Sequence, residues 1–113
     1  MITFSQEFYE KTAEYFMAKL LPEFTTILDR NTLQNAFKGF VNHLDPQNIE
    51  RLENYVHTGK EDLLVLFVER LVDYIENNDD LAFMIAILTR EKLEALTLDY
   101  LRDFRPFMVS LID

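Results

Sequence analysis

The sequence predicts an all-α fold, a single compact bundle of six or seven short helices in one domain spanning residues 1–113. Three observations lead to this prediction. Apolar residues make up 49% of the 113 residues, which is enough for one core in a chain of this length. They recur at the three- and four-residue spacing of amphipathic helices. Residues that start helices also recur at short intervals, and the chain has only two Gly and three Pro.

The first helices are predicted from start signals near the N-terminus. Thr3 and Gln6 have the spacing of a capping box, so we expect a first helix from there to about Leu21. Pro22 is expected to restart the chain as the first residue of a short helix through Leu28.

The next two helices have different kinds of start signal. Asn31 or Thr32 can cap a helix whose apolar residues continue to Leu44. Asp45 followed by Pro46 is a stronger boundary, because Asp is a favoured N-cap and Pro is well tolerated at the first helical position.

A central helix, expected from about Gly59 to Asn77, is the element around which the rest of the chain is expected to be organised. Gly59 can end the helix before it, and Thr58 with Glu61 again has capping-box spacing. Apolar residues between 63 and 75 cover most of its circumference, which is typical of a helix buried among others. We therefore expect the other helices to pack around it.

The C-terminal third is expected to hold a short helix and a long one. Residues 77–80 close the central helix and cap a short apolar helix over 81–88, and Thr89 caps the last long helix, which Pro106 ends. The apolar tail 107–112 is expected to dock on the body of the protein. Pairing of the tail with the first four residues, as a minimal two-stranded ribbon, is the less favoured alternative.

Charge narrows the range of partners. The net charge is −9. Residues 1–44 hold five acids and four bases, whereas residues 45–113 hold fifteen acids and seven bases. Such a field repels phosphate backbones and anionic lipid, so we expect no direct nucleic-acid or membrane binding, and it attracts a basic protein.

The compartment is predicted from what the sequence lacks. The longest apolar run, 81–88, is eight residues, far short of the ~20 that a membrane-spanning helix needs. No basic segment followed by an apolar one opens the chain, and there is no Cys. We expect a soluble cytoplasmic protein.

The patterns that usually indicate an enzyme or a metal site are missing. His43 and His57 have no Glu three residues before them, so the helical Glu-x-x-His motif is absent. There is no G-x-S-x-G elbow and no glycine-rich phosphate loop. We expect no catalytic residues, no metal and no cofactor. The Phe-rich interior leaves an apolar-ligand or haem binder as a third possibility.

An acidic stripe is the best candidate site. On the central helix, acids occupy a strip about 60° wide, and Leu66 falls beside it. Like charges at these spacings cost roughly 0.2–0.5 kcal/mol per pair, and Arg70 is the one base near enough in sequence to relieve them. The predicted partner-binding residues are Asp62, Leu66, Glu69, Asp73, Glu76, Asp79 and Asp80.

These features favour a small acidic protein–protein interaction module. The concrete hypothesis is an inhibitor, immunity-type protein or DNA mimic that masks a basic protein, with the stripe steering and Leu66 anchoring the partner. A homo-oligomeric structural or assembly protein is the alternative. If the stripe is not the site, Glu91, Glu94 and Asp103 are the next acids to consider.

Overall fold

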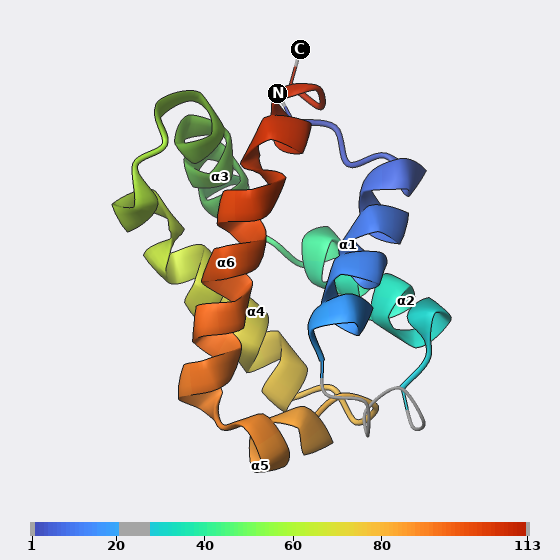
Figure 1. Cartoon of the computed structure of the whole chain (residues 1–113). Coiled ribbons are helices and arrows are strands. Elements are labelled where there is room, and N and C mark those ends of the chain that lie inside the picture. Colours follow the sequence, from blue (N-terminus) through green and yellow to red (C-terminus); the bar gives the residue numbers. More distant parts are fainter. Residues whose placement is uncertain (1, 21–27, 113) are drawn as a thin grey trace. The chain divides into compact units, whose positions relative to one another are not determined.

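The fold is all-α, as predicted. The structure is a computed structural model that describes residues 2–20 and 28–112 (Figure 1). The short helix expected after Pro22 lies outside these residues. Two compact units are present, one of residues 4–43 and one in which residues 2–3 join 44–112, and each is described by itself below.

The first unit consists of α1 (Gln6–Lys19) packed against α2 (Arg30–Asn42). An aromatic cluster joins them: the ring centroids of Phe8 and Phe37 are 5.7 Å apart, and those of Phe37 and Phe40 are 5.9 Å apart. All three rings are buried. The predicted helical spacing of apolar residues is therefore what holds this pair together.

The caps of these two helices differ from the predicted ones. The Ser5 hydroxyl, not Thr3, accepts the N-terminal hydrogen bond of α1, from the Phe8 N–H at 3.1 Å. Asp29 caps α2 by accepting from the Thr32 N–H at 2.7 Å, and this bond lowers the pKa of the Asp29 carboxyl. Several capping residues stand close together at both places, and local spacing does not decide which of them takes the extended conformation.

The second unit contains four α-helices and one 3-10 turn among the described residues. None of the described helices is long and apolar enough to cross a membrane. The elements are α3 (Pro46–Thr58), η2 (Glu61–Leu64), α4 (Val65–Glu76), α5 (Phe83–Leu88) and α6 (Arg90–Val109).

The start of α3 confirms the prediction, and so does its end. The Asp45 carboxylate accepts from the Asn48 N–H at 2.8 Å, and Pro46 is the first helical residue. Gly59 ends α3 with a φ of 73°, a left-handed conformation that glycine adopts without steric cost. The side chain of Arg105 closes over this end, since its Nε donates to the Val56 carbonyl at 3.1 Å.

The predicted central helix is shorter than expected. Thr58 forms no capping box with Glu61. Its hydroxyl donates to the Asn54 carbonyl and accepts from the Lys60 N–H. Residues 61–64 form the 3-10 turn, and the α-helix proper begins at Val65.

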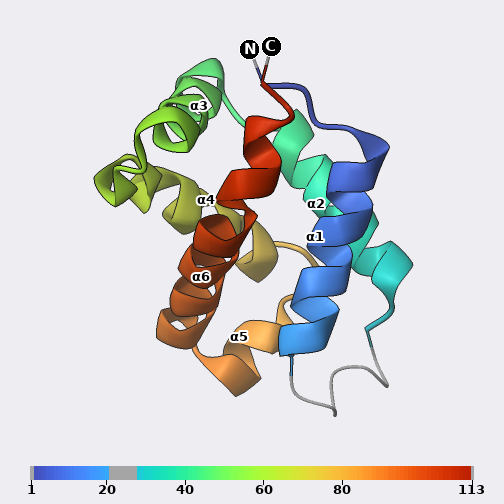
Figure 2. The same cartoon turned by 45° about the horizontal axis from the view of Figure 1, so that its top comes forward.

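α4 is central in its contacts but is not buried all round. It contacts α3, α5 and α6, and Figure 2 shows it beside α6 from a second direction. Phe67, Leu71 and Val72 are at most 3% exposed, whereas Val65 is 62% and Leu66 is 38% exposed. The expectation of an almost fully buried helix is wrong at its N-terminal end, which faces solvent.

Thr89 caps α6 as predicted and also forms the sharp turn after α5. Its hydroxyl accepts from the Lys92 N–H at 3.4 Å. Its φ of 70° and ψ of 155° lie in a region that glycine favours, which stores of order 1–3 kcal/mol of strain. α5 begins at Phe83 rather than Leu81, because residues 79–82 form turns.

The prediction that Pro106 ends the last helix is wrong. α6 continues through Pro106 to Val109. The tail docks as expected, since Met108 is fully buried. The less favoured ribbon is present as one antiparallel bridge between Ile2 and Ile112, next to a hydrogen bond from the Thr3 N–H to the Leu111 carbonyl at 2.9 Å. Burial of Met108 and this bridge hold the last turn despite the proline.

Replacing the helical proline should stabilise the protein. Pro106 is exposed, and its ring removes an N–H that would bond the carbonyl four residues earlier. Proline also stabilises the protein slightly by restricting the unfolded chain, and this benefit is lost in the variant. On balance we expect Pro106→Ala to raise the free energy of unfolding by about 2 kcal/mol. Thermal unfolding would then show a midpoint several degrees higher. A lower midpoint would mean that chain stiffness outweighs the missing hydrogen bond.

Candidate functional site

An apolar seam between α4 and α6 positions the candidate site. On α4, Phe67, Leu71 and Val72 are buried, and on α6 Leu93 and Leu101 are fully buried. Arg90 at the start of α6 pairs with Glu76 at the end of α4, and Arg102 further along α6 pairs with Glu61 in the turn before α4, so the two helices run antiparallel. Polar residues along the edge of this seam are thereby brought together from distant parts of the chain.

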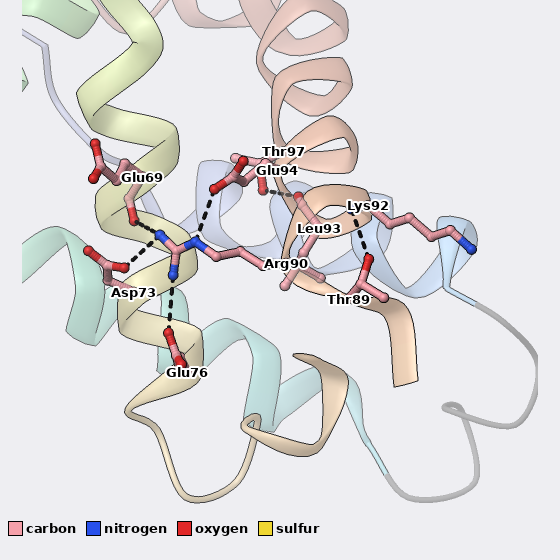
Figure 3. A network of polar contacts seen from close by, with 9 residues as sticks. All are labelled: Glu69, Asp73, Glu76, Thr89, Arg90, Lys92, Leu93, Glu94 and Thr97. Atoms are coloured by element: carbon pink, nitrogen blue, oxygen red, sulfur yellow. Dashed lines mark hydrogen bonds and ion pairs between the residues drawn. The ribbon is translucent and has the colours of Figure 1, made fainter. Parts of the chain in front are cut away.

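Arg90, the first residue of α6, binds the acids at the C-terminal end of α4 (Figure 3). Its Nη2 lies 2.6 Å from Asp73 Oδ1 and its Nη1 lies 3.1 Å from Glu76 Oε2. Its Nε donates to Glu94 Oε1 at 3.0 Å, and Nη2 also donates to the Glu69 carbonyl at 3.4 Å. We call this set the Arg90 clasp.

The clasp changes the predicted electrostatics of the acidic stripe. Arg70 was expected to relieve the like-charge repulsion, but the described residues give it no ion-pair partner, and Arg90 from α6 neutralises Asp73 and Glu76 instead. The hydrogen bond that Arg90 donates to Asp73 raises the pKa of its guanidinium. Two of the predicted site residues, Asp73 and Glu76, are therefore engaged in holding the two helices together.

A second arginine joins α6 to the 3-10 turn that precedes α4. Arg102 donates to both carboxylate oxygens of Glu61, at 2.7 and 2.8 Å, and to Asp99 at 3.4 Å. These bonds hold the pKa of the Glu61 carboxyl below its usual value. Glu61, expected to be part of a helix cap, is thus an interhelical ion-pair partner.

Between the two arginines, a groove of about 500 Å³ opens along the edge of the seam. We call it the α4–α6 groove. Its acidic rim includes Glu69 and Glu91, and among the described residues neither carboxylate has a hydrogen bond or ion pair. Five apolar residues form its floor and walls: Leu64, Val65, Val68, Ala95 and Leu98. The remaining lining residues are Glu61, Arg90 and Glu94.

The predicted site residues fall into four groups. Glu69 lines the groove, and Asp73 with Glu76 belongs to the Arg90 clasp. Leu66 is partly exposed outside the groove lining. The remaining three acids are exposed at the two ends of α4 and are not brought together with Glu69: Asp62, Asp79 and Asp80.

The sequence prediction missed the contribution of α6 to the groove. Glu91 and Glu94 were second choices, and Ala95 and Leu98 were not considered. All four share one face of α6 at three- and four-residue spacing, which is a readable signal. It could not be assigned to the stripe because only the packing of α6 on α4 brings the two faces together.

The histidines and acids offer no sign of metal chemistry within the described part of the chain. No three His, Cys, Asp or Glu side chains converge there. His43 Nδ1 lies 2.7 Å from the Gly39 carbonyl at the end of α2, and His57 is exposed in the last turn of α3.

Comparison of the chain with protein-family models, curated proteins and solved structures gives no match.

The clasp predicts that two neighbouring acids differ in their effect on stability. Asp73→Asn removes an ion pair to Arg90 and should lower the thermal unfolding midpoint at low salt. Glu69→Gln removes an unpaired negative charge and should leave the midpoint unchanged or raise it. Both differences should shrink at high salt because screening weakens the interactions of exposed charges. If Asp73→Asn raised the midpoint at low salt, the stripe would be repulsive in solution and the clasp would not compensate it.

Proposed function

We propose that this chain is an acidic protein-binding module that masks a basic protein, as inhibitors and immunity-type proteins do. The observation that carries the proposal is the α4–α6 groove. It combines an apolar floor with an acidic rim in which Glu69 and Glu91 have no ion-pair partner among the described residues. Apolar contacts supply the affinity of such a surface, and the charges supply orientation and speed of association.

The charge of the surrounding unit supports a basic partner. Fifteen acids and seven bases lie in residues 45–113, so the field around the groove is negative well beyond the site itself. A field of this sign accelerates the encounter with a positively charged protein and slows that with nucleic acid or anionic lipid. A cytoplasmic location is part of the same proposal, since the chain has no Cys that would call for an oxidising compartment.

A homo-oligomer is the alternative, and exposed Val65 and Leu66 favour it. Two copies meeting through this face would, however, bring the rim acids of one copy against those of the other. Like charges placed opposite each other oppose association, most strongly at low salt. A partner of opposite charge fits the rim better than a second copy does.

Charge reversal of the rim tests the proposal. The chain, immobilised at low ionic strength, is expected to retain a basic protein from extract of its own cells and to release it in high salt. Glu69→Lys with Glu91→Lys should abolish this retention, because two unpaired rim charges are reversed while the Arg90 clasp stays intact.

The matched control is Glu10→Lys with Glu50→Lys, which changes the net charge equally at exposed positions on α1 and α3. The control should retain the same protein. If both variants lost the basic protein equally, the effect would come from net charge rather than from the rim. If both retained it equally, the rim would not be the binding site. Either result contradicts the proposal.

A further inference from the structure

We propose that the partner segment in the α4–α6 groove is a short amphipathic helix. It presents two apolar side chains one turn apart to the groove floor, and a Lys or Arg one turn further on to Glu69 and Glu91. This inference rests on the proposed function and specifies which part of a basic protein the groove recognises.

The walls of the groove favour a helix over an extended strand. Both walls are formed by helices, α4 and α6, whose interior backbone groups bond within their own helix. Beyond the first turn of each helix, these walls offer no free N–H or carbonyl row to an extended segment, unlike a sheet edge. A guest must therefore satisfy its own backbone, which a helix does, and its side chains make the contacts.

The dimensions of the groove set the length of the guest. The α6 wall runs from Glu91 to Leu98, about 10 Å at the rise of an α-helix, or two turns. Two apolar side chains at i and i+4 span the middle of that distance. Two antiparallel helices also leave a furrow parallel to their axes, in which a third helix packs by its ridges.

The apolar part of the guest is matched by small or exposed side chains. Ala95 is exposed, and Val65 is 62% exposed on the opposite wall. Neither fills the space between the helices, so branched or straight apolar side chains from a guest have room there. A small ligand buries most of its surface in its cleft, whereas a wall this exposed is better covered by a broader protein surface.

The two ends of the groove differ in charge, so a guest helix is expected to bind in one orientation. At the end near Leu64, Arg102 neutralises Glu61 through two hydrogen bonds. At the other end Glu69 and Glu91 have no ion-pair partner within residues 2–20 and 28–112, and Arg90 is already bound by three carboxylates. Within the described lining of the groove, a guest cation is thus best placed at the Arg90 end, beyond the apolar floor.

Synthetic peptides separate the parts of this proposal. The first is a helix of about 12 residues with Leu at i and i+4 and Lys one turn further. The second has the same composition in an order without an apolar stripe, and the third replaces both Leu by Ala. Fluorescence anisotropy of labelled peptides measures binding to the intact chain. We expect the first to bind at least about tenfold more tightly than the others, as loss of an anchor commonly costs that much.

A variant that fills the groove while keeping its charge supplies the second measurement. Ala95→Trp places a large ring on the groove wall at an exposed position, and Ala18→Trp makes the same change on α1 as a control. Circular dichroism verifies that both stay folded. Ala95→Trp should weaken binding of the first peptide at least about tenfold, and Ala18→Trp should leave it within about twofold of the parent.

The outcomes distinguish this inference from the proposed function. Equal binding of all three peptides, or unchanged binding by Ala95→Trp, overturns the helix-in-groove inference. If Glu69→Lys with Glu91→Lys still abolishes retention of the basic protein in that case, the proposed function stands with a different contact mode. If the peptides do not bind and charge reversal has no effect, both fail.

Discussion

The structure around the candidate site depends on the apolar seam between α4 and α6. Burying a side chain such as Leu71 or Leu101 contributes about 1.5–3 kcal/mol, considerably more than an exposed ion pair normally does. Burial of the apolar seam is therefore the main interaction that stabilises the antiparallel packing of the two helices. This packing places Arg90 beside Asp73 and Arg102 beside Glu61. It also leaves the α4–α6 groove, where the side chains at the edge are too small to fill the space between the helices.

The ion pairs of Arg90 and Arg102 form because the two helices already pack together, and they are not the main cause of that packing. Each neutralises acids at one end of the seam, and together they define which carboxylates remain available. An acidic helix without them would be a diffuse negative edge, useful for solubility. With them, the groove acids that have no ion-pair partner among the described residues are Glu69 and Glu91, at the Arg90 end of the apolar floor. This division between structural and unpaired acids is what makes a directional binding surface physically reasonable.

Most of the helical layout could be predicted from the sequence, because its signals are local. Asp45 with Pro46, Gly59 and Thr89 all act within a few residues of their own position. The sequence predictions are wrong where the structure depends on contacts between residues far apart in the chain. Pro106 continues a helix because Met108 is buried against the body, and Asp73 is neutralised by an arginine 17 residues away in the chain. The acidic stripe was visible in the sequence. The groove was not, since half of its lining comes from α6.

The central claim is that the α4–α6 groove is the binding surface of this protein. An NMR titration with the Leu- and Lys-bearing helix would test it most directly, because backbone amide shifts report each position separately. The account predicts that the largest shifts fall on residues 64–69 and 91–98, with little change in α1 and α2. Shifts concentrated in α1 and α2, or around exposed Ile87 and Val109 with the groove unaffected, would contradict it.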